Sequence, residues 1–473
     1  MTAAIVKNAR WLHLGAGAFH RAHQAWYLHL LQHQAASLPT SPRWSLSLAN
    51  IRNSATQHTL QQLARQQGRY TLEVISPEGE TRWHRLAVID RVILWDAGLA
   101  SLVAEGAHPQ TKVISFTVTE GGYFLRDDGR LDETHPAVAS DLAGQGETQT
   151  LYGALVKILR ARREANAGAV TLLSCDNLRH NGDVLRRGLL AFIAASGDEA
   201  LGEWVASHTT SPNNMVDRIT PVPDAGLPER LAAQGIADDK VPLTCEAFTQ
   251  WVMEDRFIAG RPPLEQVGVE FVDDVTPWEE VKIRVLNASH SGIAWAGGLL
   301  GKASIDQSLL PTVTRWLSDY VRDDLAPTLA APGIDLDAYC ASTLHRFSNP
   351  GVRDSVQRVS SDSIAKLHEF IVPTLKARYA QGVVPRAALM LPALLFCFMQ
   401  REQRGELAFA YQDRARASVD FLAVYRDASP VRAFAAQPAL FGSLCQQPTL
   451  AADLQQAVDR VEAWLAGGEG AAA

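Results

Sequence analysis

The chain has 473 residues, of which 47% are hydrophobic and 20% are charged, so we expect two or three globular domains. Its net charge of −7, without a clustered Lys/Arg stripe, argues against nucleic acid or an anionic membrane as the main partner. No apolar run reaches the roughly eighteen residues of a membrane span, and the start lacks an apolar signal core. We therefore expect a cytoplasmic protein with no membrane partner.

The first predicted strand leads into a glycine turn and a helix, in the segment that starts at Trp11. Gly15 permits the turn, and Gly17 lacks the Cβ that would block a pyrophosphate from the backbone. His20 replaces the third glycine of the usual G-x-G-x-x-G pattern, so an ordinary strand-to-helix turn remains the alternative. We favour a cofactor turn, and its candidate residues are Gly15, Gly17, Ala18, Phe19 and His20.

Strand and helix patterns then alternate up to about residue 220. We predict strands at 44–48, 70–75, 83–89, 112–118 and 170–174, and a helix over 152–166. The second and third of these strands would form a hairpin. This alternation is typical of a doubly wound sheet, whose ligands lie beyond the carboxyl ends of the strands. Two polar loops, Thr119–Tyr123 and Cys175–Gly182, follow strands at that position.

Helical periodicity prevails after Pro277. The clearest helical stretches are 312–323, 361–380, 386–403, 415–426 and 451–466. We therefore predict an α/β fold with a Rossmann-type, NAD-binding doubly wound domain over residues 1–276. A mainly α-helical substrate and catalytic domain over residues 277–473 follows it.

Lys282, Asn287 and His290 bring an amine, an amide and an imidazole into nine residues. In an α-helix, the lysine and the asparagine would lie about 140° apart, and the asparagine and the histidine would share a face. A lysine in a low-dielectric site can serve as a general base, while Asn and His stabilise a developing alkoxide. The alternative is an amphipathic helix with three polar residues on its wet side.

Metal binding is not expected. The five cysteines are far apart and form no C-x-x-C pair, so we expect reduced and mostly buried thiols. Four histidines crowd the first helix, but no acidic residue occurs from 1 to 72. We interpret these as phosphate-side or surface imidazoles rather than metal ligands, and they are His20, His23, His29 and His33.

Five separated motifs, in this order, resemble one family. They are the glycine turn with His20-Arg-Ala-His-Gln, the loop Thr119–Tyr123, Ser174–Asn177 with Asn181-Gly182, Asn214–Pro221, and Lys282…Asn287…His290. The family is that of the polyol-specific long-chain dehydrogenases, also called the mannitol dehydrogenase family. The resemblance extends from Trp11 to beyond Lys366 and implies a metal-independent oxidoreductase.

The resemblance assigns chemical roles to the last motif. It implies that Lys282 is the general base and that Asn287 and His290 polarise the reacting oxygen. It also implies that Glu279 connects the lysine to solvent as a proton exit. A surface ion pair between Glu279 and Lys282, three residues apart, is the alternative for that glutamate.

The resemblance also implies a set of substrate-binding residues, namely Asn177, Asp217, Arg358 and Lys366. Neutral amides and carboxylates suit the many hydroxyls of a sugar alcohol. Ser361 stands where a related mannitol enzyme can carry a histidine, which indicates a different far end of the pocket. For Arg358 and Lys366, ion pairs with Asp354 or Asp362 remain the alternative.

The family context favours NAD as the cofactor, held by the glycine turn and by Asn50, Arg52, Thr119 and Glu120. A ribose-binding carboxylate is expected after the second strand, but Ala49–Asn53 contains none. Asn50 could bond a ribose hydroxyl, and Arg52 could pair with the 2′-phosphate of NADP.

The opening segment and Asn50-Ile-Arg52 are most similar to the arabinitol-oxidising members of the family. The expected reaction is therefore reversible oxidation of D-arabinitol to D-xylulose, with a small polyol or ketose as the partner. Oxidation of mannitol to its 2-ketose and reduction of a hexuronate are the alternatives within the family. A dinucleotide-binding redox or sugar sensor and a zinc-dependent dehydrogenase are the alternatives outside it.

Overall fold

The computed structural model describes residues 8–34, 43–126, 128–144, 146–330 and 333–467. The start segment that lacks a signal core precedes these residues. The chain divides into two compact units, one of Met1–Ile75 with Thr81–Thr276 and one of Ser76–Glu80 with Pro277–Ala473. Within the described ranges, no helix is long and apolar enough to cross a membrane.

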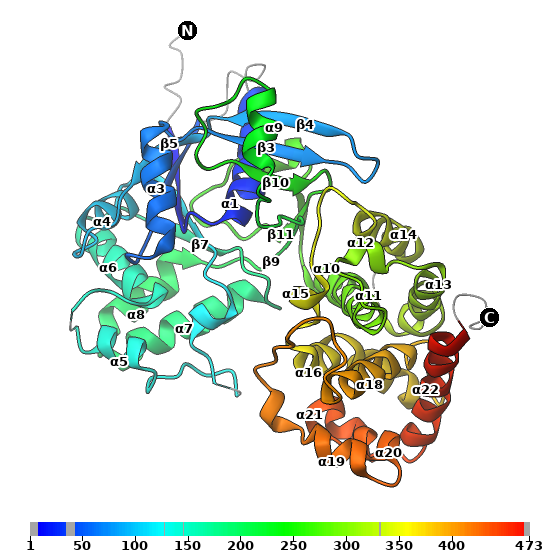
Figure 1. The fold of residues 1–473 in the computed structure, drawn as a ribbon. Coiled ribbons are helices and arrows are strands. Elements are labelled where there is room, and N and C mark those ends of the chain that lie inside the picture. Colours follow the sequence, from blue (N-terminus) through cyan, green and yellow to red (C-terminus); the bar gives the residue numbers. More distant parts are fainter. Residues whose placement is uncertain (1–7, 35–42, 127, 145, 331–332, 468–473) are drawn as a thin grey trace. The chain divides into compact units, whose positions relative to one another are not determined.

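A six-stranded parallel sheet lies at the centre of the first unit (Figure 1). In sheet order, its strands are β5 (Ile89–Ile93), β2 (Trp44–Ala49), β1 (Ala9–Leu14), β6 (Thr111–Phe116), β7 (Val170–Ser174) and β8 (Thr209–Thr210). This is the 3-2-1-4-5-6 order of a Rossmann fold, in which the strand order reverses between β1 and β6. The predicted Rossmann-type α/β fold is confirmed.

Both faces of the sheet are buried because the central strand β1 directs apolar side chains to either side. Trp11 belongs to one hydrophobic core, and Leu12 and Leu14 belong to the other. The helices of this unit are α1 (Ala18–Ala22), α2 (Gln24–Gln34), α3 (Ala55–Arg65), α4 (Ala100–Gly106), α5 (Pro136–Leu142), α6 (Leu151–Glu164), α7 (Asn181–Ala195), α8 (Glu199–His208) and α9 (Leu227–Ala233), with short 3-10 turns η2 (Glu120–Tyr123) and η3 (Leu264–Val267).

Two three-stranded sheets complete the first unit. One has the order β10 (Leu243–Glu246), β3 (Tyr70–Ile75), β4 (Thr81–Leu86), and the other has the order β12 (Glu270–Val272), β11 (Gln250–Glu254), β9 (Asn214–Asp217). The predicted hairpin is confirmed as β3 and β4, but the single strand predicted over 83–89 is wrong. The chain turns after Leu86, and Ile89 starts β5, where it pairs with Leu46 of the main sheet.

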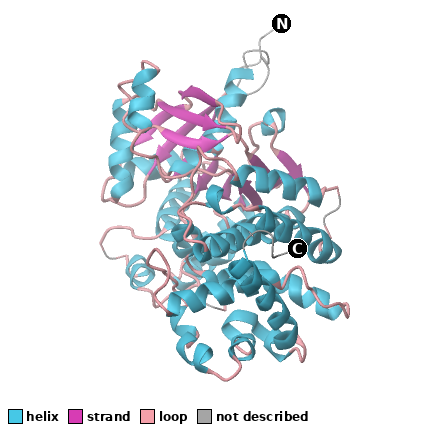
Figure 2. Cartoon of the chain, turned by 45° about the vertical axis from the view of Figure 1, so that its right-hand side comes forward, coloured by secondary structure: helices cyan, strands magenta, loops and turns pink. Residues whose placement is uncertain are grey.

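The described residues of the second unit form helices and no strand (Figure 2). The α-helices are α10 (Thr276–Val281), α11 (Ala288–Leu299), α12 (Ile305–Ser308), α13 (Pro311–Asp319), α14 (Leu336–Phe347), α15 (Val356–Ser360), α16 (Ser363–Lys366), α17 (Val372–Ala380), α18 (Met390–Gln403), α19 (Phe421–Arg426), α20 (Pro430–Ala435), α21 (Pro438–Phe441) and α22 (Leu450–Gly467). Shorter turns are η4 (Lys282–Asn287), η5 (Tyr320–Leu325), η6 (Ala326–Thr328), η7 (Leu367–Ile371), η8 (Arg416–Ser418) and η9 (Gly442–Gln446). The predicted mainly helical C-terminal part is confirmed. The single helix predicted over 415–426 is wrong, because Val419 is extended and separates η8 from α19.

Helix α11 is the central helix of this unit. Every one of its residues except His290 is buried. A Cβ at Gly292 would overlap Leu391, and one at Gly298 would overlap Phe398, so these glycines let α18 pack directly against the α11 backbone. This close packing fixes where α11 carries His290.

Candidate active site

The glycine turn after β1 leaves open space where a ligand phosphate is expected. Gly15 has φ +115°, and its N–H donates to the Ala49 carbonyl at 2.7 Å, so the turn requires a glycine there. Gly17 has an ordinary φ of −61°, and a Cβ on it would meet only Thr117 Oγ1, at 4.0 Å. Neither backbone conformation nor protein packing demands Gly17, which fits a dinucleotide approaching this turn.

Asn50 and Arg52 follow β2, beside the turn. Asn50 is buried and donates from Nδ2 to Thr56 Oγ1 at 2.8 Å, which orients its side-chain amide. Arg52 is exposed. The structure therefore offers an oriented amide and a surface guanidinium at this place, but no carboxylate between residues 50 and 54.

Asp176 holds the loop that carries Thr119 and Glu120. Its carboxylate accepts the backbone N–H groups of Val118 at 2.9 Å and Thr119 at 2.7 Å, and the Tyr123 hydroxyl at 2.7 Å. Burial raises the pKa of Asp176 against the opposing effect of these hydrogen bonds. Thr119 has φ +63°, a strained conformation for a β-branched residue, and Asp176 holds it there.

Asp176 was not predicted from the sequence, whereas its neighbour Asn177 was. The structure shows Asp176 buried and directed at the β6 loop, whereas Asn177 is exposed. The only cue in the sequence was the position of both residues directly after a buried strand.

A network of two buried amides links the loops that carry Asn177 and Asp217. Asn181 donates to the Asp176 carbonyl at 3.0 Å and to the Asn214 carbonyl at 2.8 Å. Asn214 donates in turn to the Ser174 carbonyl at 2.6 Å. The end of β7, the start of α7 and the start of β9 are therefore cross-linked, and Asp217 lies at the far end of β9 with 5% of its surface exposed.

Phosphate-side or surface imidazoles were expected near the N-terminus: a surface position is wrong for three of the four residues, and a phosphate-side position stays a prediction. His20 and His23 are completely buried, His29 is 8% exposed, and only His33 is exposed. Burial lowers the pKa of His20 to about 3 and that of His29 to about 4, so both are neutral at physiological pH. The sequence could not reveal the burial of His29, because the apolar and polar faces of α2 are poorly segregated.

The helix that carries Lys282, Asn287 and His290 changes its hydrogen-bonding pattern within the motif. Between α10 and α11, residues Lys282–Asn287 form the π-helical turn η4. Because π-helical hydrogen bonds join residues five apart, Lys282 and Asn287 lie one turn apart rather than at the α-helical angle of about 140°. The π-helical turn therefore brings Lys282 and Asn287 toward one face of the helix. Helix α11 then places His290 one α-helical turn beyond Asn287.

Lys282 and Glu279 are both buried, with 7% and 4% of their surfaces exposed. A surface ion pair, the alternative for Glu279, is therefore inconsistent with the structure. The alternative in which Lys282 lies on the solvent-exposed face of an amphipathic helix is also inconsistent with its burial. Asn287 and His290 are partly exposed.

The His290 ring is held by an aromatic stack. It packs on Phe347 with ring centroids 4.4 Å apart and planes 17° apart. Its Nε2 lies 3.8 Å from Asp354 Oδ2. Burial lowers the pKa of His290 to about 4, which Asp354 opposes and which the cations Arg358, Lys366 and Arg346 reinforce. His290 is therefore a neutral imidazole at physiological pH.

Arg358 and Lys366 lie close enough to His290 for their charges to lower its pKa, and substrate binding by these two residues stays a prediction. The Arg358 guanidinium forms a two-pronged ion pair with Asp354, which is the structural alternative anticipated from the sequence. Lys366 donates to the Val359 carbonyl at 2.7 Å, and burial lowers its pKa to about 8. Ser361 donates to the Arg358 carbonyl at 2.7 Å.

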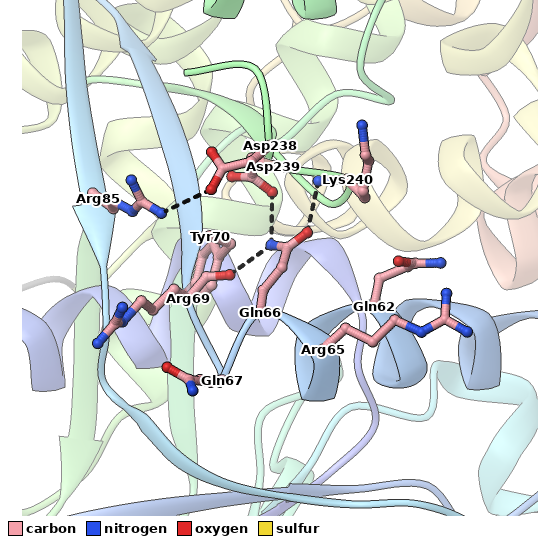
Figure 3. Close-up of a pocket in the computed structure, with 10 residues that line it drawn as sticks. All are labelled: Gln62, Arg65, Gln66, Gln67, Arg69, Tyr70, Arg85, Asp238, Asp239 and Lys240. Atoms are coloured by element: carbon pink, nitrogen blue, oxygen red, sulfur yellow. Dashed lines mark hydrogen bonds and ion pairs between the residues drawn. The ribbon is translucent and has the colours of Figure 1, made fainter. Parts of the chain in front are cut away.

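A surface pocket of about 370 Å³ lies elsewhere in the first unit (Figure 3). It is bordered by the end of α3, by Arg85 and by the loop 238–240, and it contains none of the predicted site residues. Gln66 bridges it by donating to Asp239 at 3.0 Å and accepting from the Lys240 N–H at 2.7 Å. In the described part of the chain, no three His, Cys, Asp or Glu side chains form a metal-binding group.

Comparison with known proteins decides the family. Residues 9–266 match the Mannitol dehydrogenase Rossmann domain, and residues 274–462 match the Mannitol dehydrogenase C-terminal domain. The chain belongs to the mannitol dehydrogenase family. It is therefore an oxidoreductase, and the suspected relationship is confirmed.

Two relatives and one solved structure show which proteins this chain is similar to. D-arabinitol 4-dehydrogenase of Klebsiella pneumoniae is 48% identical, over 95% of this chain and 98% of its own. Polyol:NADP oxidoreductase of Gluconobacter oxydans (strain 621H) is 36% identical, over 83% and 81%. The structure of Pseudomonas fluorescens mannitol 2-dehydrogenase in a ternary complex with NAD and D-mannitol is 33% identical with a TM-score of 0.80, and the match covers 96% and 92%.

Replacing Asp176 with Asn tests the anchoring of the β6 loop. An amide can accept at only one oxygen and turns donors toward backbone N–H groups, so we expect a loss of about 2 kcal/mol in unfolding free energy. The Michaelis constant for the dinucleotide should also rise. Urea unfolding and steady-state kinetics measure both effects. Asp128→Asn, an exposed carboxylate in the next turn, is the control, and equal effects of both variants would contradict the anchoring role.

The histidines with lowered pKa values predict acid lability. His20, His29 and His290 have folded pKa values of about 3, 4 and 4, below the ordinary value near 6.5. At pH values between each folded pKa and about 6.5, the unfolded chain binds protons that the folded chain does not. The free energy of unfolding therefore falls as the pH falls below about 6.5. Urea unfolding midpoints from pH 7 to 5 measure this. His29→Gln should flatten the slope and exposed His58→Gln should not; an unchanged slope in His29→Gln would contradict the assignment.

Proposed function

We propose that this protein is an NAD-dependent polyol dehydrogenase that oxidises D-arabinitol reversibly to D-xylulose, with Lys282 as the general base. The observation that carries the proposal is the 48% identity to a D-arabinitol 4-dehydrogenase over nearly the whole of both chains. The predicted catalytic triplet Lys282, Asn287 and His290 is intact in this chain and lies on one continuous helical segment.

The chemistry requires a proton acceptor and a stabilised oxygen. When bound, NAD accepts the hydride from the carbon that carries the reacting hydroxyl. Lys282 Nζ, as a neutral amine, takes the proton of that hydroxyl as its oxygen becomes a carbonyl oxygen. Burial of Lys282 supports this role because a low-dielectric environment disfavours an ammonium. In the reverse reaction, the ammonium returns the proton to the nascent alkoxide.

Asn287 and His290 stabilise the charge that develops on the same oxygen. Asn287 supplies amide N–H groups, and a neutral His290 supplies one ring N–H. The stack on Phe347 supports a fixed orientation of that ring. We further propose that Glu279, buried three residues before Lys282, passes the proton onward toward solvent.

Asn177 and Asp217 are proposed to bind the remaining substrate hydroxyls, and the amide network of Asn181 and Asn214 supports their joint placement. Lys366 is proposed to reach the substrate as well. The ion pair of Arg358 with Asp354 leaves that arginine less suited to a substrate carboxylate, which supports a polyol over a hexuronate.

NAD is proposed as the cofactor because the oriented Asn50 amide can bond a ribose hydroxyl without demanding a 2′-phosphate. The glycine turn and the loop with Thr119 and Glu120 complete its proposed site. The relative named as a polyol:NADP oxidoreductase and the exposed Arg52 make NADP the competing cofactor.

A substrate and cofactor panel tests the proposal. We expect turnover of D-arabinitol to exceed that of mannitol, sorbitol and fructuronate, and NAD to exceed NADP in kcat/KM by about tenfold or more. Absorbance of the reduced cofactor measures all combinations. Strict fructuronate activity would overturn the polyol assignment, a preference for NADP would overturn the cofactor, and binding without turnover would favour a sensor.

Replacing Lys282 with Met tests the general base. Turnover should fall by about 10²–10⁴-fold, while NADH binding, measured by fluorescence titration, stays close to that of the wild type. Lys302→Met, another lysine of the same unit, is the control and should keep its activity. Normal turnover in Lys282→Met, or loss of wild-type activity after prolonged chelation, would contradict a metal-independent lysine mechanism.

A further inference from the structure

Two stacked imidazoles fill the contact between the first strand and the first helix. His13 on β1 and His20 on α1 are both completely buried. Their ring centroids are 3.4 Å apart and their planes differ by 11°, so the two rings are in face-to-face van der Waals contact. His13 lies two residues before Gly15 and His20 lies three residues after Gly17, on either side of the glycine turn.

This contact occupies a position that usually belongs to a glycine. In the common dinucleotide-binding fingerprint, the third glycine allows the helix backbone to approach the strand. Here the residue at that place is His20, so the spacing between α1 and β1 is set by the thickness of two flat rings instead. A side chain that is not flat would not fit the same gap without moving the helix.

The stack is also tied to the neighbouring strand. His13 Nδ1 lies 2.7 Å from Ser115 Oγ on β6, and the Trp11 indole N–H donates to the same hydroxyl at 2.6 Å. Two residues beyond Ser115, the Thr117 carbonyl lies against Gly15. The two strands that border the reversal of strand order are therefore both connected to the ring pair.

No part of the His20 ring reaches the surface, so a ligand that lies on the surface of the glycine turn does not touch the ring. A neutral ring also supplies no positive charge to a pyrophosphate. Burial is what keeps His20 neutral, with a pKa of about 3, and only the side chain of Gln24 acts in the opposite direction. The contribution of His20 must therefore come from its shape and its position.

We propose that His20, stacked on His13, is a positioning residue that sets the geometry of the glycine turn for dinucleotide binding. This role rests on the proposed function, because it requires the turn to bind NAD. In this role His20 acts through the glycine turn and not through the direct cofactor contact that the sequence led us to expect. His13 acts together with His20 as its stacking partner.

Two substitutions of similar size separate shape from hydrogen bonding. His20→Phe keeps a flat ring and removes the nitrogens, whereas His20→Gln keeps a polar group and removes the ring. NADH affinity, measured by fluorescence titration, should stay within about threefold of the wild type in His20→Phe and weaken by about tenfold or more in His20→Gln. At saturating NAD, the Michaelis constant for the polyol should be unchanged in both.

His29→Gln provides the matched control, because it removes another buried imidazole one helix further on, and it should leave NADH affinity unchanged. Urea unfolding of all three variants checks that they fold. Tight NADH binding by His20→Gln, or weak binding confined to His20→Phe, would overturn the positioning role. If the wild type binds neither NADH nor NADPH, the proposed function itself fails.

Discussion

The π-helical turn at Lys282–Asn287 is the constraint on which the proposed chemistry depends. An α-helix would direct these two side chains to different sides, whereas hydrogen bonds five residues apart bring them onto successive turns of one face. The turn is held in place by α11, which is buried on all sides except at His290 and packs through glycines against α18. A rigid, apolar helix thus supports a locally irregular and polar segment, which is a common arrangement at functional sites.

Buried polar groups perform the same supporting task in the Rossmann unit. Asp176 fixes the loop after β6, Asn181 and Asn214 join the end of β7 to the start of β9, and His13 with His20 spaces α1 from β1. Each group is costly to bury, and each lies beside a strand terminus or in the segment that follows a strand. The parallel sheet defines where a ligand binds, and these groups determine the precise backbone positions of the loops there.

Regular elements were predictable because their side-chain periodicity reflects burial. Strands β2, β3, β6 and β7 and the helices α13, α17, α18 and α22 follow from period and composition alone, whereas α14 was not predicted. The break between Leu86 and Ile89 was not predictable, since apolar residues continue through it and only pairing with Leu46 reveals it. The π-turn was also hidden, because residue types do not specify which carbonyl an N–H selects. For the candidate site, the motif spacing singled out Lys282, Asn287 and His290, whose catalytic roles stay predictions, but not Asp176 or His13, whose contacts are with residues distant in sequence.

The proposed mechanism requires a neutral amine at position 282 that takes the proton of the substrate hydroxyl. Chemical rescue provides the test: Lys282→Ala is assayed for D-arabinitol oxidation with added primary amines of increasing basicity and similar size. Activity should return in proportion to the concentration of free amine and increase with amine basicity. Failure of every amine to restore turnover in a folded variant that still binds NADH would contradict it, as would rescue that is independent of basicity.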